Sequence, residues 1–298
     1  MTVEEPPRAA EAPSAADRAF ALLQSLLPRH ALSRAMHGLA RSTRPAVRRN
    51  LIRFVLRAYP RIDLREAVEP DPHAYPSFNA FFTRALRAGA RPIAPGPDEV
   101  AAPVDGTVSQ RGIVEDGQLL QAKGVRYTVA ALLADSAAAA RYAGGAFACI
   151  YLAPHDYHRI HMPLAGRLDA TRYVPGDFFS VNAATTRTVP ELFARNERVV
   201  CEFDTTLGPL AMVLVGALFV GSLETVHAGE INPPGTRGGA VRRIDAGLGT
   251  QFAKGAELGR FNMGSTVIVV LGNRGVRFAE RFVAGATIRM GQPIAKVG

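Results

Sequence analysis

Three of the seven histidines fall within one short stretch of the sequence, at His155, His158 and His161. Histidine exchanges protons readily near neutral pH, so this run indicates general acid–base chemistry. A zinc site is the obvious rival, but the spacing does not match the i, i+4 pair of helical zinc motifs. Pro154 and Pro163 bracket the run and disfavour a helix. We therefore expect an extended acid–base segment, against the alternative of a chance cluster of surface histidines.

A second candidate is the triplet Gly264-Ser265-Thr266, which directly precedes the apolar run Val267–Val270. Taken alone, such a triplet is typical of a tight turn, and it lacks the GxSxG pattern of α/β-hydrolases. A serine hydroxyl can attack the carbonyl before it only where the backbone tolerates strain and close approach. Glycine provides both. The pair Gly264-Ser265 is therefore a candidate for attack of a serine on its own peptide bond.

A third candidate is Asp105, which stands in the stretch Pro103–Thr107 at a strand-to-turn position. Asp-Gly is a standard turn dipeptide, so a structural role is the simpler interpretation of this residue. A carboxylate that orients a histidine is the functional alternative.

The elements that must position these residues change character along the chain. Apolar residues recur at helical spacing in three segments of the first third, which Pro28, Pro45 and Pro60 separate. From Val100 onward, short β-rich runs alternate with Gly and Asp-Gly turns, and one helix is expected over Val129–Tyr142. The pattern predicts an α+β fold with N-terminal amphipathic helices and a mainly antiparallel β-rich body.

These patterns divide the chain into regions. We expect a disordered leader over 1–16, a helical region over 17–90, a Pro-rich linker from Arg91 to Pro97, and a β-rich catalytic domain over 98–298. The start has no signal-peptide pattern, and no stretch is apolar enough to span a bilayer. Cys149 and Cys201 have no metal-type spacing and are expected to be core thiols.

Positive charge is concentrated in the helical region. Between Asp17 and Arg65 there are eleven arginines and two acidic residues, which accounts for the whole net charge of +9. Arg49, Arg53 and Arg57 share one helix face. An anionic membrane surface and a nucleic acid are the two partners that such a patch fits. A solvated helical hairpin packed on the main domain is the alternative.

Together, these stretches resemble the bacterial phosphatidylserine decarboxylase family. The likeness rests on Gly264-Ser265-Thr266, on the run from His158 to Pro163, and on Asp105 in its Pro-Val-Asp-Gly frame. Further segments resemble the family in the same order: Phe78–Arg84, Val174–Asp177, Leu192–Arg198 and Val215–Ala217. The resemblance extends from roughly residue 22 to the C-terminus.

The resemblance implies a self-processing, pyruvoyl-dependent enzyme. Asp105, His161 and Ser265 would cleave the chain between Gly264 and Ser265, giving a β chain of residues 1–264 and an α chain of residues 265–298. Ser265 would become a covalent pyruvoyl group that forms a Schiff base with phosphatidylserine and releases CO2 and phosphatidylethanolamine. His158 would supply the proton in decarboxylation, whereas His155 is expected to be a bystander.

Cofactors and partners follow from the same resemblance. We expect no pyridoxal phosphate, because none of the three lysines stands in a cofactor-site context, and no metal, because the histidine spacing does not match zinc motifs. The expected partners are phosphatidylserine, the paired α and β chains, an anionic membrane surface at the cytoplasmic face of the cell membrane, and a second copy in a homodimer. Nucleic acid is not expected. The alternative functions are a serine hydrolase that uses Ser265, His161 and Asp105, and a non-enzymatic membrane-binding module.

Overall fold

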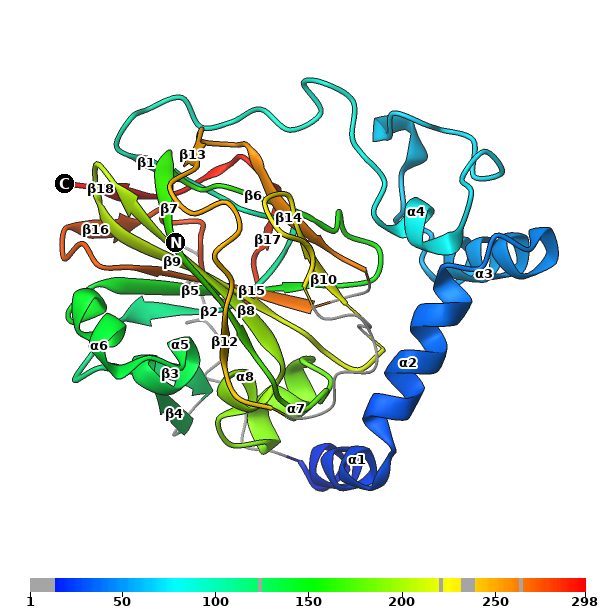
Figure 1. Ribbon diagram of the computed structural model, residues 1–298, viewed down its shortest axis with the longest axis horizontal. Coiled ribbons are helices and arrows are strands. Elements are labelled where there is room, and N and C mark those ends of the chain that lie inside the picture. Colours follow the sequence, from blue (N-terminus) through cyan, green and yellow to red (C-terminus); the bar gives the residue numbers. More distant parts are fainter. Residues whose placement is uncertain (1–13, 123–124, 220–221, 232–238, 263–264) are drawn as a thin grey trace, which may run out of the picture.

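The computed structural model describes residues 14–122, 125–219, 222–231, 239–262 and 265–298. A helical arm lies along one side of a β-rich body (Figure 1). The α+β layout predicted from the sequence is therefore confirmed. The leader expected over 1–16 lies outside the described residues except for its last three, and so does Gly264 of the expected cleavage site.

The arm consists of three helices, α1 (Ala15–Leu26), α2 (Arg29–Ala40) and α3 (Pro45–Ala58). Ser14 caps α1, since its side chain accepts a hydrogen bond from the backbone of Asp17. Pro45 occupies the first turn of α3, where a missing N–H costs nothing. The three helical segments expected from the sequence are confirmed.

Short helices fill the connections of the remaining chain. They are η1 (Leu64–Glu66), α4 (Phe78–Phe82), α5 (Val129–Leu133), α6 (Ser136–Ala139), η2 (Ala140–Tyr142), α7 (Ala183–Thr188) and α8 (Leu192–Arg195). The single helix expected over Val129–Tyr142 is wrong in one respect, because it is broken between Leu133 and Ser136. Ala134 adopts a left-handed conformation, with φ of 53°, and ends α5. Asp135 then caps α6 through its side chain, so the chain starts a new helix.

The body is built on a nine-stranded sheet. Its strand order is β12-β7-β8-β9-β15-β5-β2-β17, and β13 also pairs with β7. The strands are β2 (Gly106–Ile113), β5 (Ala146–Leu152), β7 (Gly166–Val174), β8 (Arg198–Thr205), β9 (Gly208–Val215), β12 (Arg242–Arg243), β13 (Gln251–Phe252), β15 (Ser265–Leu271) and β17 (Thr287–Ile288). All its named pairings are antiparallel, as expected.

Smaller sheets flank this one. A four-stranded sheet contains β6 (Arg159–His161), β10 (Leu223–Thr225), β11 (Gly229–Glu230) and β14 (Glu257–Phe261). A three-stranded sheet contains β1 (Glu99–Ala101), β16 (Val276–Phe278) and β18 (Pro293–Val297), and a hairpin contains β3 (Gln118–Ala122) and β4 (Val125–Thr128). The chain passes from β14 in the four-stranded sheet to β15 in the large one through residues 262–264, where the expected cleavage site lies.

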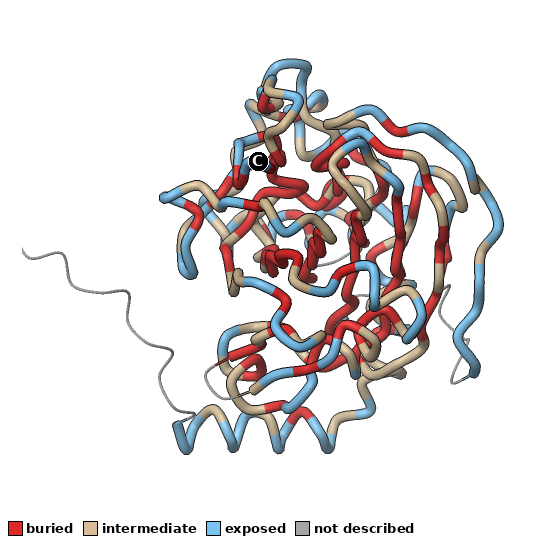
Figure 2. The backbone as a smooth tube through the Cα atoms, turned by 90° about the vertical axis from the view of Figure 1, so that its left-hand side faces the viewer, coloured by how far each residue is buried: buried red, intermediate tan, exposed pale blue. Residues whose placement is uncertain are grey.

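The large sheet is covered on both faces. Along β15, Val267 and Val269 belong to one hydrophobic core and Ile268 and Val270 to another. This alternation follows from the two-residue period of a strand, and it makes the strand apolar throughout. Figure 2 shows the resulting buried interior, with α1 exposed along its outer side. Cys149 and Cys201 are both buried and free, as expected for core thiols.

Candidate active site

Ser265 is the first residue of the central strand β15 and lies opposite Leu152 of β5. Its side chain is completely buried, and its hydroxyl oxygen has no hydrogen-bond partner among the described residues. A buried hydroxyl without a partner is costly, so natural proteins rarely keep one without a use. The sequence singled out this serine, and the structure places it in a fully buried position.

Three more buried polar atoms also lack a hydrogen-bond partner among the described residues. They belong to residues that are close to Ser265 in sequence or lie on neighbouring segments. The atoms are Nε2 of His158, Oδ1 of Asn262 and Oγ1 of Thr266. The backbone N–H of Phe261, the last residue of β14, donates to the carbonyl of His158 at 3.1 Å. His158 therefore lies beside the end of the strand that leads to Ser265.

The imidazole of His158 is held in one orientation. Its Nδ1 lies 2.9 Å from the carbonyl oxygen of Asp156, and its ring centroid is 4.1 Å from that of Phe82. A carbonyl only accepts hydrogen bonds, so Nδ1 carries the proton of the neutral ring and Nε2 keeps a free lone pair. Burial lowers the pKa of His158 to about 3. At neutral pH the residue is thus an uncharged base.

His161 is the last residue of β6. Its Nδ1 is 2.8 Å from the carbonyl oxygen of Gly255, and its Nε2 is 3.1 Å from the hydroxyl of Tyr157. Burial lowers the pKa of His161, although the Gly255 carbonyl and the charges of Glu257 and Asp105 oppose that shift. Both ring nitrogens of His161 are therefore occupied by other groups in this structure.

Asp105 is fixed at the start of β2 by close backbone packing. A side chain on the next residue, Gly106, would come within 2.4 Å of the carbonyl oxygen of Tyr151, so only glycine fits there. The Asp105 carboxylate accepts hydrogen bonds from the Arg91 guanidinium, the shortest at 2.6 Å, and from the backbone N–H of Met290 at 2.8 Å. Arg91 also binds Glu66.

The structure brings the three expected self-processing residues to neighbouring elements without joining their side chains. The backbone N–H of His161 donates to the carbonyl of Pro103 at 2.8 Å, which places β6 beside the Asp105 segment. Asp105 acts on His161 electrostatically, but it is hydrogen-bonded to Arg91 instead. No hydrogen bond joins His161 to Ser265 in the described part of the chain. The triad stays a prediction, and catalytic contacts often form only in the reacting complex.

Two of these partners were missed in the sequence. Arg91 begins the segment interpreted as a linker, and Tyr157 lies within the histidine run without having been given a role. Burial alone would lower the pKa of Arg91, but its bonds to Asp105 and Glu66 raise it instead. A lone arginine in a linker carries no local signal, so only the fold could reveal this ion pair.

His155 lies on the same loop as Asp156 and is partly exposed, with Nε2 3.6 Å from a carboxylate oxygen of that residue. Its ring centroid lies 6.2 Å from that of Tyr59 in the segment after α3. Across the part of the chain that the structure describes, no group of three or more histidine, cysteine or acidic side chains could hold a metal ion.

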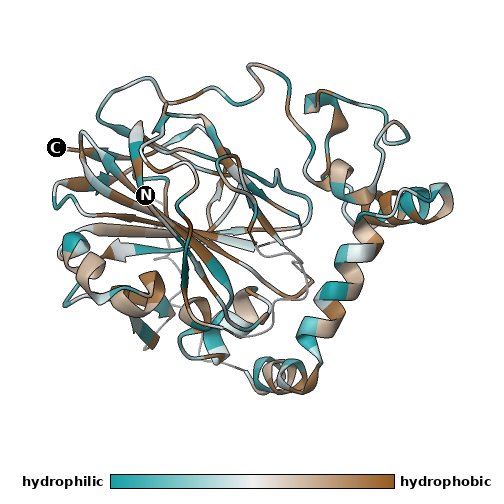
Figure 3. Cartoon of the chain, viewed as in Figure 1, coloured by the Kyte–Doolittle hydropathy of each residue, from teal (hydrophilic) through white to brown (hydrophobic). Residues whose placement is uncertain are grey.

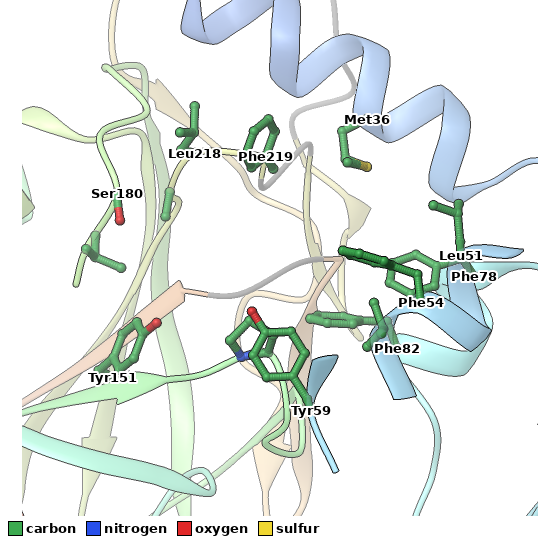
Figure 4. Close-up of a pocket in the computed structure, with 14 residues that line it drawn as sticks. Met36, Leu51, Phe54, Tyr59, Phe78, Phe82, Tyr151, Ser180, Leu218 and Phe219 are labelled. Atoms are coloured by element: carbon green, nitrogen blue, oxygen red, sulfur yellow. The ribbon is translucent and has the colours of Figure 1, made fainter. Parts of the chain in front are cut away.

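A cavity of about 360 Å³ lies where the helical arm meets the body. Figure 4 shows aromatic and aliphatic side chains facing it from both sides, among them Phe54 and Phe82 from the arm side and Tyr151 from β5. Phe82 is the ring that packs on His158, and Tyr151 pairs with Thr266 on β15. This apolar cavity, lined mainly by hydrocarbon, therefore borders the elements that carry Ser265 and His158.

Comparison with known families agrees with these features. The family model described as phosphatidylserine decarboxylase matches residues 78–296, and a second model described as PSD matches residues 19–60. The first match alone covers well over half of the chain. The chain therefore belongs to the phosphatidylserine decarboxylase family.

Curated relatives resemble the chain over nearly its whole length. A phosphatidylserine decarboxylase proenzyme of Ectopseudomonas mendocina is 51% identical over 277 residues, which cover 92% of this chain and 96% of the relative. The proenzyme of Methylococcus capsulatus is 50% identical over 274 residues, covering 91% and 94% of the two chains. That of Azotobacter vinelandii is 50% identical over 285 residues, covering 94% and 98%.

Proposed function

We propose that this chain is the precursor of a phosphatidylserine decarboxylase that cleaves itself between Gly264 and Ser265. The observation that carries the proposal is Ser265 itself, a buried serine at the head of the central strand whose hydroxyl has no hydrogen-bond partner in the described ranges. The membership of the chain in the phosphatidylserine decarboxylase family supports it.

Self-cleavage needs only the chain's own atoms and one water molecule. The Ser265 hydroxyl attacks the carbonyl of Gly264 and replaces the peptide bond by an ester, while a base takes the hydroxyl proton. Removal of the α-proton of residue 265 then expels the Gly264 carboxylate and leaves a dehydroalanine. Water hydrolyses its tautomer to a pyruvoyl group and ammonia. We assign the base to His161, with Asp105 stabilising its charge.

The residues present fit a pyruvoyl group at position 265. In support of this fit, the Ser265 oxygen has no hydrogen-bond partner among the described residues, and the same holds for Oγ1 of Thr266 and Oδ1 of Asn262. A pyruvoyl group supplies the electron sink that decarboxylation of an amino acid requires, as pyridoxal phosphate does elsewhere.

We assign His158 to proton delivery at the substrate carbon. It is neutral in this structure, because burial holds its pKa near 3. It must therefore gain a proton before it can give one. A substrate that brings negative charge next to the ring would raise the pKa of His158 and favour that protonation.

We further propose that the enzyme is peripheral to the membrane and that the helical arm, α1–α3, holds it at an anionic surface on the cytoplasmic side. Large apolar side chains of the arm face solvent: Phe20, Leu22, Leu23, Leu26, Leu39 and Phe54. Arg18, Arg34 and Arg53 are exposed on the same helices. Figure 3 shows hydrophobic and hydrophilic stretches alternating along the arm, outside the sheets. Such a combination is typical of helices that lie in the headgroup region.

No helix in the described ranges is long and apolar enough to cross a bilayer. The arm is instead joined to the body by polar contacts, including ion pairs of Arg187 with Asp17 and of Arg29 with Asp177. These contacts hold the arm in place while its outer side stays exposed. The homodimer expected from the sequence stays a prediction.

Vesicle flotation tests the membrane proposal. Replacing Leu22, Leu23 and Leu26 together by serine should weaken binding to phosphatidylglycerol vesicles at least tenfold, because three exposed leucines would no longer enter the bilayer. Each arginine near an anionic surface adds about 1 kcal/mol. Raising the salt concentration from 0.1 M to about 0.5 M should therefore also weaken binding.

The matched control is Ile113→Ser, which removes an exposed apolar side chain from β2 of the body. It should leave flotation unchanged. Equal binding of the triple variant and the natural chain would return the arm to a purely structural role.

The direct test of the proposed function is turnover. The purified, processed protein should convert phosphatidylserine in mixed micelles to phosphatidylethanolamine with one CO2 for each molecule consumed. Phenylhydrazine, which captures reactive carbonyl groups, should abolish CO2 release. Release of free fatty acid or of free serine instead would indicate a hydrolase.

A further inference from the structure

Arg84 is the most unusual charged residue of the body. The residue is 5% exposed, yet its Nε has no hydrogen-bond partner and its guanidinium forms no ion pair with a carboxylate among the described residues. Its guanidinium carbon lies 5.7 Å from the centre of the Phe81 ring, a distant cation–π contact. A buried guanidinium is normally paired, because removing it from water is expensive.

Arg84 lines a polar cavity of about 180 Å³. The carboxylates in its wall are already engaged: Glu66 and Asp105 with Arg91, Asp63 with Arg65, and Asp156 with the backbone N–H of Ala153. Arg289 also forms an ion pair with Glu66. Among the described residues, Arg84 and the exposed Arg61 feel the charges of Asp105 and Asp156 but form no hydrogen bond or close ion pair with these carboxylates. These two guanidiniums therefore keep N–H donors available for an anionic ligand, whereas the carboxylates of the wall are occupied.

The polar cavity adjoins the apolar cavity described above. Three short segments contribute an apolar side chain to one cavity and a polar side chain to the other. The pairs, apolar member first, are Tyr59 with Arg61, Phe82 with Arg84, and Pro154 with His155. The two cavities therefore lie against the same three segments of the chain. A ligand that spans them needs a hydrocarbon part and an anionic part joined by a short linker.

We propose that Arg84, assisted by Arg61, binds the phosphodiester of the lipid substrate while the adjoining apolar cavity receives the start of an acyl chain. The inference rests on the proposed function. A guanidinium suits a phosphate because two parallel N–H donors match two phosphate oxygens. The backbone next to Arg84 is held in place, because Nε of Arg159 on β6 donates a hydrogen bond to the carbonyl of Thr83 at 2.9 Å.

Phosphate binding at Arg84 has a consequence for His158. The Arg84 charge is one of the groups that lower the pKa of His158, after burial. A bound phosphate offsets that charge and makes protonation of the imidazole easier. Substrate binding thereby prepares the residue to which we assign proton delivery.

The test compares Arg84→Gln and Arg84→Lys with the natural chain and with Arg277→Gln, an exposed arginine of β16. Processing into two chains on a denaturing gel shows that each variant folds. The substrate is dihexanoyl phosphatidylserine. The inhibitor is dihexanoyl phosphatidylethanolamine, which has the phosphate but lacks the carboxylate.

Arg84→Gln should be processed, should raise the KM roughly ten- to hundredfold, and should raise the inhibition constant of the phosphatidylethanolamine by the same factor. Arg84→Lys should recover part of both losses, and Arg277→Gln should change neither. Inorganic phosphate alone should inhibit far more weakly than the lipid, because it cannot use the apolar cavity.

Three results would overturn the proposal. Unchanged KM and inhibition constant in processed Arg84→Gln would remove Arg84 from the binding site. A raised KM with an unchanged inhibition constant would show that Arg84 recognises the substrate carboxylate. Inhibition by inorganic phosphate as strong as by the lipid would indicate a site for free phosphate. Absence of CO2 release from the processed natural chain would instead refute the proposed function.

Discussion

Ser265→Ala should remain a single uncleaved chain and should release CO2 from phosphatidylserine at least about a thousandfold more slowly than the processed natural protein. The hydroxyl is both the attacking group and the source of the pyruvoyl carbonyl, so its loss removes cleavage and cofactor together. Folding should be unaffected, because the Ser265 hydroxyl makes no hydrogen bond to the described residues that alanine would lose. A denaturing gel and CO2 capture measure the two effects.

The neighbouring hydroxyl provides the control. Thr266→Val removes another buried, unbonded hydroxyl from the same strand with little change in volume. It should still give two chains. Two chains from Ser265→Ala would contradict the proposed chemistry of that residue.

The two histidines of the run should divide the work. His161→Ala should stay one chain, as should Asp105→Ala, because we assign both residues to the self-cleavage step. His158→Ala should be cleaved at least in part but should decarboxylate roughly a hundred- to ten-thousand-fold more slowly, the usual cost of losing a general acid. Gel analysis and CO2 release, measured on the same samples, separate the two steps.

If the two histidine variants showed the reverse behaviour, the structure would explain why. His158 is the histidine whose Nε2 lone pair is free, whereas Nε2 of His161 is bonded to the Tyr157 hydroxyl. An uncleaved His158→Ala together with a cleaved His161→Ala would therefore transfer the self-cleavage base to His158. Conservative variants, His158→Gln and His161→Gln, guard against loss of packing around either ring.

The main elements of the fold could be predicted because their signals are local. The apolar run at Val267–Val270 is buried on both faces of a sheet, and prolines separate the three helices of the arm. The break in the helix expected over Val129–Tyr142 was not predictable in the same way. It depends on a left-handed Ala134, a residue type whose propensity favours continuing a helix.

The site could be predicted only as a set of residue types. Ser265, His158 and Asp105 were predicted because their stretches together resemble the family, and their roles stay predictions. Their partners were not found, since the Asp105–Arg91 pair joins the body to a segment that has no pattern of its own. Arg84 became informative only once the fold showed a buried guanidinium without a carboxylate.

The measurement that bears most directly on the central claim is a mass spectrum of the purified protein in denaturant. The proposal predicts two chains, one of residues 1–264 and one of 34 residues, 265–298. The smaller chain should be lighter by one ammonia than the same peptide with an N-terminal serine, because a pyruvoyl group has replaced that serine. A single intact chain of 31.8 kDa from a preparation that releases CO2 from phosphatidylserine would contradict the account.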